Sequence, residues 1–310
     1  MTHPHFGAAA ALGASVTWAF ASTRYAQASR DVGSQRVNLA RAIVVLPIYA
    51  AVLFASRGAR SLDGVDGAHA GWMLMSVACS YALADGLFFA AARRLGISTA
   101  LSIASSYPLW AALAGALVRG EAFGPARVGG TLLCVGGVVA LVRLHASASG
   151  GASGGAGSGA GASAGEKRRA DPLGVALAVG TSVLWAGNSF SIKEASAGLD
   201  VWQVNAVRYA MALVLLAAQV AIMRVPDARP APARGWPALV PAILIDALLG
   251  SVLYVIGLSN TDLAVGSTLS SLAPLISVPF AIALGEEKWS ASRFAAVTAT
   301  VAGIVLLVAS

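Results

Sequence analysis

The chain has 310 residues, of which 57% are hydrophobic and only 11% are charged, and its mean hydropathy is +0.74. Soluble domains carry roughly a quarter charged residues, so the composition excludes an ordinary soluble protein and indicates a polytopic membrane protein. The net charge of +7 comes from Arg and Lys in loops, where it concerns membrane orientation, and nucleic acid is not an expected partner.

Ten apolar runs are long enough, at about 20 residues, to cross the hydrocarbon core as helices. In chain order they lie at residues 7–27, 38–56, 70–91, 97–118, 125–144, 173–192, 203–223, 237–257, 264–284 and 293–309. Continuous Ala, Leu and Val runs are typical of helices in lipid, whereas barrel strands alternate. The sequence predicts an all-α integral membrane protein with ten transmembrane helices. No Lys or Arg precedes the first run, so we expect a retained helix there and not a signal peptide.

The chain contains an internal duplication. Residues 13–41 align without gaps on residues 180–208, at a shift of 167, with eleven of 29 positions identical. A shift of 166 continues the match and pairs Ser105-x-x-Pro108 with Ser271-x-x-Pro274. Because each copy has an odd number of helices, the second must enter the membrane in the opposite sense. We therefore expect two inverted five-helix repeats, an arrangement common in secondary transporters, with the substrate site near the midplane.

The domain boundaries follow from this duplication. The first repeat is predicted at residues 1–144 and the second at residues 172–310. Residues 145–171 are mostly Gly, Ala and Ser and show no apolar periodicity. This composition indicates a flexible tether between the repeats.

A phrase late in the first helix of the second repeat, WAGNSFSIK at residues 185–193, carries a family resemblance. Together with an Arg early in the next helix, a Ser- and Pro-bearing fourth helix and a Gly-Glu before the fifth, it resembles EamA-type members of the drug/metabolite transporter superfamily. The first repeat departs from the pattern, because Phe20, Ala21 and Ala26 replace its Gly, Asn and Lys.

The resemblance implies a ten-helix exporter or exchanger of small metabolites that works by alternating access in the plasma membrane. It also implies cytoplasmic termini, whereas the distribution of Arg and Lys among the loops favours the reverse orientation.

Two acidic residues fall inside predicted helices, where a charged group is a functional hypothesis by default. They are Asp85 in the third helix and Asp246 in the eighth. Our hypothesis is that one of them, preferably Asp246, takes up a proton or binds a cationic group of the substrate. The alternative is a neutral or paired aspartate near a helix end.

Prolines interrupt the fourth and ninth predicted helices at Pro108, Pro274 and Pro279. Each removes a backbone hydrogen bond, and interrupted segments at matching positions indicate a transporter's binding site. Ser105 and Ser271 lie within a turn of these breaks and could bond freed carbonyls or substrate. A simple packing kink is the alternative.

Aromatic and polar residues of several helices are candidates for lining the substrate pathway. Tryptophans and tyrosines in such a chain also form interfacial belts. The candidates are Trp18, Trp185, Asn188, Ser189, Tyr81, Tyr107, Tyr254, Ser105 and Ser271. Arg41 and Arg208 each follow an Asn by three residues near a helix start, where we expect their side chains to extend to the lipid headgroups.

Small residues recur on one face of the fifth and tenth predicted helices, where they permit close helix contact and predict a scaffold role. They are Gly129, Gly130, Gly136 and Gly137, matched by Ala295, Ala296, Ala302 and Gly303.

An enzyme is not expected. The histidines fall at the terminus or in loops, no H-E-x-x-H is present, and the lone Cys79 and Cys134 indicate neither disulfide nor metal site. No cofactor or metal is predicted. The expected partners are the lipid bilayer and a small-molecule substrate, with monomer and homodimer both open.

The residues favour a neutral or zwitterionic substrate, such as an amino acid. An exchanger of sugar phosphates or nucleotide sugars would need several basic residues in the cavity. A membrane protein without transport activity, such as a channel or receptor, is the remaining alternative.

Overall fold

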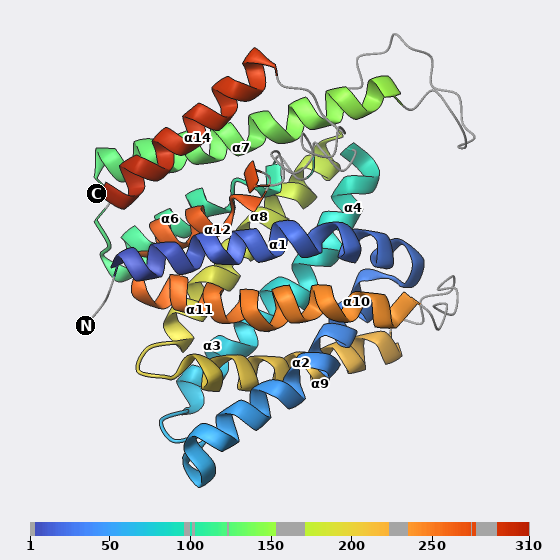
Figure 1. Cartoon of the computed structure of the whole chain (residues 1–310), viewed down its shortest axis with the longest axis vertical. Helices are drawn as coiled ribbons and strands as arrows, with labels where there is room; N and C mark the ends of the chain where they lie inside the picture. Colours follow the sequence, from blue (N-terminus) through green and yellow to red (C-terminus); the bar gives the residue numbers. More distant parts are fainter. Residues whose placement is uncertain are drawn as a thin grey trace.

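The computed structural model describes residues 4–95, 100, 103–122, 124–152, 171–222, 235–273, 275–276 and 290–309. Every regular element within these ranges is helical, and they contain no strand (Figure 1). In the first repeat the elements are α1 (Pro4–Val32), α2 (Ser34–Arg57), a 3-10 turn η1 (Gly58–Arg60), α3 (Gly67–Val77), η2 (Ala78–Ala84), α4 (Asp85–Leu95), α6 (Tyr107–Arg119) and α7 (Pro125–Ala152). In the second they are α8 (Pro172–Ala195), α9 (Val201–Ile222), α10 (Gly235–Ile243), η3 (Leu244–Gly250), α11 (Ser251–Asn260), α12 (Leu263–Ser270) and α14 (Ala291–Ala309).

Several of these helices are long and apolar enough to cross a membrane. Five such segments lie at residues 34–60, 67–88, 172–195, 201–222 and 239–260, and shorter apolar helices occupy residues 125–140 and 294–309. The chain is therefore an all-helical, multi-pass membrane protein, while the count of ten spans stays a prediction. Most of the predicted tether lies outside the described residues, although α7 continues to Ala152 and so takes up the first part of it.

In the fourth helix the structure places the break just before Pro108 and not at the proline itself. In the first repeat a turn at Ser105 and Ser106 interrupts the helix, and Pro108 is the second residue of α6. Proline is tolerated there because the first backbone N–H groups of a helix have no intrahelical acceptor. The matching Ser271 ends α12. Pro274 and Pro279 lie outside the described residues.

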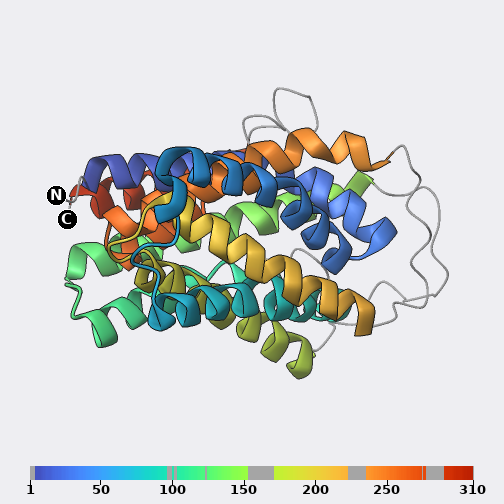
Figure 2. The ribbon, with the colours of Figure 1, turned by 90° about the horizontal axis from the view of Figure 1, so that it is seen from below.

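Packing follows the duplication. Helix α1 packs on the helix that runs through α10, η3 and α11, and the matching helix α8 packs on the one that runs through α3, η2 and α4. Matching helices also contact each other directly, α2 with α9 and α7 with α14. Helix α6, which follows the break in the fourth helix, packs on α12, which precedes the matching break in the ninth. Both termini lie at the same end of the bundle (Figure 2). We call it the terminal end.

The two repeats run in opposite directions at their first helices. A side chain at Gly7, near the start of α1, would lie 2.8 Å from Thr261. The Lys193 side chain, near the end of α8, donates to the Thr261 carbonyl. The start of one helix and the end of its counterpart therefore meet at the terminal end.

A charged contact fixes the start of α8. Asp171 caps the helix by accepting a hydrogen bond from the Leu173 backbone N–H at 3.1 Å, and Arg94 Nη1 donates to its carboxylate at 2.7 Å. The hydrogen bond from Arg94 lowers the pKa of Asp171 below its ordinary value. This pair joins the end of α4 to the start of α8.

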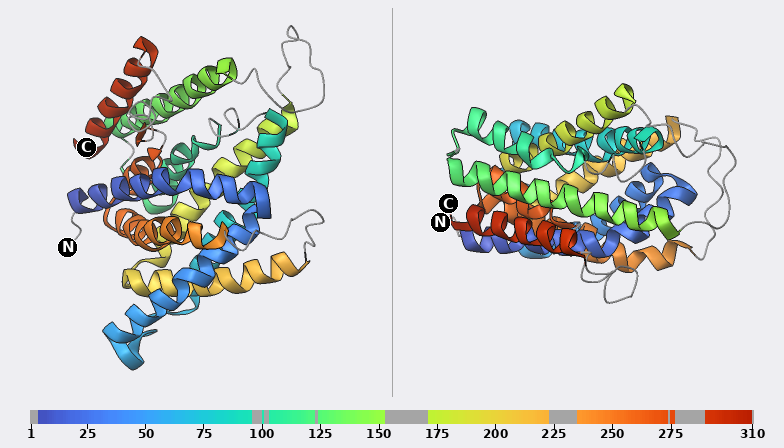
Figure 3. Two further views of the ribbon diagram at one scale, coloured as in Figure 1. Left: turned by 45° about the vertical axis from the view of Figure 1, so that its right-hand side comes forward. Right: turned by 90° about the horizontal axis from the view of Figure 1, so that it is seen from above.

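Helices α7 and α14 lie side by side at one edge of the molecule (Figure 3). Their contact depends on glycines that leave no room for a side chain. A Cβ atom on Gly137 would lie 2.7 Å from the Ala296 carbonyl oxygen, and one on Gly303 would lie 2.6 Å from that of Gly130. By contrast, a Cβ atom on Gly136 meets nothing within 4 Å.

Gly137→Ala should therefore destabilise the protein, whereas Gly136→Ala should not. The new methyl group forces α7 and α14 apart, an overpacking that costs about 1–3 kcal/mol. The neighbouring substitution makes the same chemical change on an open face of the same helix. Thermal unfolding in detergent, followed by size-exclusion fluorescence, checks the difference. Equal melting temperatures for the two variants would show that this contact does not limit stability.

Candidate functional site

Two turns of π-helix occupy matching places in the repeats. η2 (Ala78–Ala84) and η3 (Leu244–Gly250) are related by the same shift of 166 residues that relates the later parts of the sequence. Each interrupts the middle of a long α-helix. A π-turn is rare, occurs often at functional sites, and leaves carbonyl groups without their usual helical donor.

Side chains from the opposite repeat bond the carbonyls of both π-turns. Tyr49 of α2 donates its hydroxyl to the carbonyls of Ala247, at 3.0 Å, and Leu248, at 2.7 Å. The carbonyl of Ala82, which matches Leu248, accepts from Nε2 of Gln219 in α9 at 3.0 Å. The second helix of each repeat therefore holds the π-turn of the other. These contacts place η2 and η3 at the interface between the repeats.

A cluster of charges lies beside η3. Arg41 Nη2 donates to Asp246 Oδ2 at 2.8 Å, and both side chains are about nine-tenths buried. Arg41 Nη1 also donates to Asn38 Oδ1 at 3.2 Å, and Asn38 donates in turn to Asp85. We call Asn38, Arg41, Asp85 and Asp246 the Arg41 cluster.

Aromatic rings surround the Arg41 guanidinium. Its central carbon lies 4.7 Å from the ring centroid of Tyr25, 5.4 Å from that of Tyr81 and 5.9 Å from that of Trp18. Cation–π contacts of this kind stabilise a desolvated cation. Arg41 is only 9% exposed, so the prediction that its side chain extends to the headgroups was wrong. Hydrogen bonds inside the bundle satisfy Nη1 and Nη2, whereas the buried Nε has no hydrogen-bond partner among the described residues.

A second cluster surrounds Arg208, which matches Arg41. Arg208 Nε donates to the Ser76 hydroxyl at 3.0 Å, and that hydroxyl donates to Asn188 Oδ1 at 2.7 Å. Ser251 donates to Asn205 Oδ1 at 2.7 Å. We call these five residues the Arg208 cluster. Arg208 is 3% exposed, so its predicted position at the headgroups was also wrong.

The two clusters contain matching hydrogen-bonded pairs but differ in charge. The pair Asn38–Asp85 matches the pair Asn205–Ser251 at the repeat shifts, so the same contact is ionisable in one repeat and neutral in the other. Arg41 pairs with an acidic residue of the opposite repeat, Asp246. Among the described residues of its own opposite repeat, Arg208 hydrogen-bonds only to the Ser76 hydroxyl. One cluster thus holds a cation with two carboxylates, and the other a cation alone.

The predicted pathway residues fall into separate groups. Trp18 and Tyr81 border the Arg41 cluster, and Asn188 belongs to the Arg208 cluster. Ser189 shares a 2.7 Å hydrogen bond with the Tyr254 hydroxyl.

Trp185 packs instead against Tyr107, with ring centroids 6.0 Å apart, and the Tyr107 hydroxyl donates to the Ser267 carbonyl at 3.0 Å. Ser105 is buried at the break before α6, and Ser271 bonds the Thr268 carbonyl of its own helix at 2.7 Å. These residues lie at the contacts among α8, α6 and α12, and within the described residues none of them hydrogen-bonds to either arginine cluster.

The arginines are the residues whose importance sequence reasoning underestimated. A signal existed, because Asn-x-x-Arg recurs at the same place in both copies, as Asn38 with Arg41 and Asn205 with Arg208. Ser76 had no such signal, since a lone Ser in an apolar run reveals nothing about the partner that folding brings to it.

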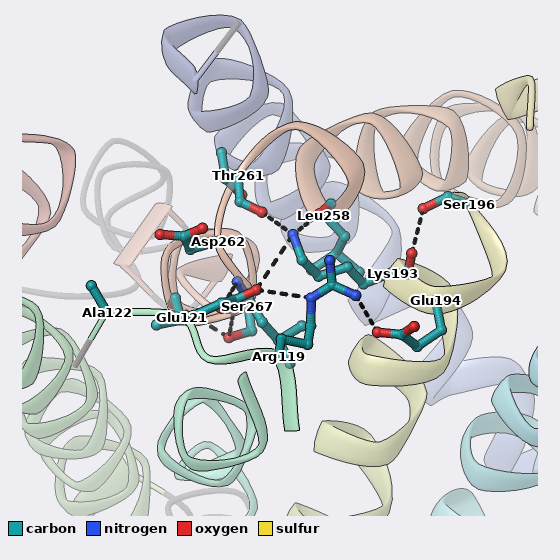
Figure 4. A network of polar contacts seen from close by, with 12 residues as sticks. Arg119, Glu121, Ala122, Lys193, Glu194, Ser196, Leu258, Thr261, Asp262 and Ser267 are labelled. Atoms are coloured by element: carbon teal, nitrogen blue, oxygen red, sulfur yellow. Dashed lines mark hydrogen bonds and ion pairs between the residues drawn. The ribbon is translucent and has the colours of Figure 1, made fainter. Parts of the chain in front are cut away.

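A third polar group lies at the terminal end of the bundle, where α6, α8, α11 and α12 meet (Figure 4). Lys193, only 8% exposed, donates to the carbonyls of Leu258, at 3.0 Å, and Thr261. Its ammonium lies 3.7 Å from Glu121 Oε1, and Glu121 Oε2 accepts from the Leu263 backbone N–H at 2.7 Å. We call Lys193, Glu121 and Arg119 the Lys193 network.

The network connects the two repeats at this end. Arg119 donates to Glu121 at 3.2 Å and also forms an ion pair with Glu194. In the first repeat Ala26 stands where the second has Lys193, so the lysine contacts belong to the terminal end only. A buried ion pair that bridges separate helices is suited to hold one end of a helix bundle closed.

Comparisons with known proteins agree with this architecture. The model of the EamA-like transporter family matches residues 5–143 and 172–309. One solved structure, described only as the crystal structure of a protein, is 20% identical, with a TM-score of 0.71 over 98% of this chain and 94% of its own. That likeness shows the fold alone, and no curated protein matches. Because the family model covers both repeats, the chain belongs to the EamA-like transporter family and is a membrane transporter of the drug/metabolite transporter type.

Proposed function

We propose that the protein is a secondary transporter, an exporter or exchanger in the plasma membrane, for small neutral or zwitterionic metabolites such as amino acids. The two repeats would alternately open the interface that contains η2 and η3 to either side of the membrane. Family membership supports transport, and the matched π-turns support a site between the repeats.

The two arginine clusters carry unequal charge, and this difference supports the proposed substrate class. Asp85 and Asp246 outnumber Arg41 in one, and Arg208 is the single charge of the other. A zwitterion carries both a cation and an anion, and its two groups complement the opposite charges that the two clusters offer. A phosphorylated sugar is less well supported, because the Arg41 guanidinium is already occupied by Asp246.

Asp85 is the better candidate for coupling to protons. Asp246 lies against Arg41 at 2.8 Å, which favours the paired interpretation of that residue. The hydrogen-bond partner of Asp85 is the neutral amide of Asn38. A carboxylate without a cation in direct contact exchanges a proton, or accepts an ammonium group, without first breaking an ion pair.

Transport by purified protein in proteoliposomes tests the function. We expect counterflow of at least one radiolabelled L-amino acid, faster with a pH gradient than without. Empty liposomes provide the background. Counterflow of a sugar phosphate, with none of any amino acid, would overturn the proposed substrate class.

Asp85→Asn should abolish the effect of the pH gradient while leaving counterflow itself. The amide keeps the shape and a hydrogen bond to Asn38 but cannot release a proton. Counterflow driven by substrate alone, compared with uptake driven by the pH gradient, separates coupling from transport. A gradient response equal to that of the unaltered protein would show that Asp85 does not couple, and the same comparison for Asp246→Asn would then test the other acid.

A further inference from the structure

Arg208 is a buried cation that lacks an acidic partner. The residue is 3% exposed, and the hydrogen bond from Nε to Ser76 is the one that its side chain makes within the described residues. No carboxylate there lies within ion-pairing distance of it. Removing a charge from water costs several kcal/mol unless another charge compensates it. A buried cation without an acidic partner inside a helix bundle indicates a binding site for an anion.

The matching arginine of the first repeat shows which kind of anion can fill this role. Arg41, the counterpart of Arg208, receives the Asp246 carboxylate from the π-turn of the opposite repeat. The residue of η2 that matches Asp246 is Ser80, whose shorter side chain bonds the Ser76 carbonyl of its own helix at 2.7 Å. The carboxylate that completes the first contact is therefore absent from the second.

We propose that Arg208 binds the carboxylate group of the transported substrate, in the role that Asp246 plays toward Arg41. The inference rests on the transport function proposed above and adds the group that is recognised and the residue that recognises it. The fork of guanidinium N–H donors matches a carboxylate in two parallel hydrogen bonds.

Neighbouring side chains keep the guanidinium in place for this task. Ser76 holds Nε and is itself held by Asn188, so the terminal nitrogens stay directed away from that hydrogen-bonded edge. Asn188 therefore acts here as a positioning residue. The next residue of α8, Ser189, is hydrogen-bonded to Tyr254 of α11 at 2.7 Å. The fixed edge of Arg208 pre-organises it, which reduces the entropy lost on binding.

A pair of probes that differ only in the carboxylate tests the proposal. Each L-amino acid that the unaltered protein transports is compared with its primary amide, which keeps the ammonium group and side chain but has no negative charge. We expect the amide to compete at least about tenfold more weakly, the discrimination typical of charge-assisted hydrogen bonds. Arg208→Gln should weaken the acid by a similar factor and leave the amide unchanged, so that the preference disappears.

Two further variants keep the test sharp. Arg208→Lys retains the charge without the planar fork and should preserve part of the preference. Arg57→Gln removes an exposed arginine, paired with Asp200 at 3.7 Å, and should leave the preference intact. Folding is checked by melting temperature, and the ratio of acid to amide affinity is independent of the amount of folded protein.

An acid preference that survives Arg208→Gln would overturn the inference while transport itself stands. A protein that transports no amino acid at all would instead overturn the proposed substrate class, on which this inference rests.

Discussion

Arg41→Met is expected to lower the free energy of unfolding by about 3–5 kcal/mol, the usual effect of removing one partner from a buried ion pair. The substitution leaves the Asp246 carboxylate, 8% exposed at its side chain, without its cation. It also removes the hydrogen bond to Asn38 and the contacts with the rings of Tyr25 and Tyr81. Methionine fills much of the same volume, so the loss reports on charge more than on packing. Denaturation in detergent, followed by circular dichroism, measures it.

The double variant Arg41→Met with Asp246→Leu provides the control. Replacing both members of a buried pair by apolar residues is often neutral. We therefore expect the double variant to recover most of the stability that Arg41→Met loses. A double variant that is less stable than Arg41→Met alone would contradict this expectation. The stability lost with Arg41 would then come from contacts other than the ion pair with Asp246.

Lys193→Met is expected to open the terminal end of the bundle. It removes the donor to the Leu258 and Thr261 carbonyls and leaves Glu121 with less positive charge nearby. These contacts join α8 to α11 and α12, so their loss favours states in which the helices separate at this end. A change of about 2 kcal/mol shifts a two-state equilibrium by about 30-fold.

A reporter cysteine measures this opening. Ala186 lies seven residues before Lys193, on nearly the same face of α8, and is 4% exposed. In a background with Cys79→Ala and Cys134→Ala, a charged thiol reagent should modify Ala186→Cys at least about tenfold faster when Lys193→Met is present. Arg57→Ala, which removes the exposed pair with Asp200, is the matched control, because such pairs contribute only about 0–1 kcal/mol. Equal rates in all three proteins would show that the network does not hold this end closed.

Much of the fold could be predicted from the sequence alone. Apolar runs predict helices in lipid because every backbone polar group there must bond within its own segment. The duplicated Asn-x-x-Arg and Ser-x-x-Pro patterns predict two related halves, and both halves match the family model. These signals are local or periodic, so they are visible without knowing which helices touch.

The functional partnerships required the tertiary structure. An arginine near a helix start extends to the headgroups or turns into the bundle depending on what faces it, and the local sequence is the same in both cases. Arg41 turns inward because Asp246, 205 positions away in the chain, meets it across the repeat interface.

The helical, duplicated architecture and the two intramembrane acids are thus readable from the order of residues alone. The pairing of one acid with Arg41, the contact of each π-turn with the opposite repeat, and the lack of an acidic partner for Arg208 within the described residues emerge only from the folded chain. Charge pairing depends on distances between helices that lie far apart in sequence, and no pattern within one helix specifies such distances.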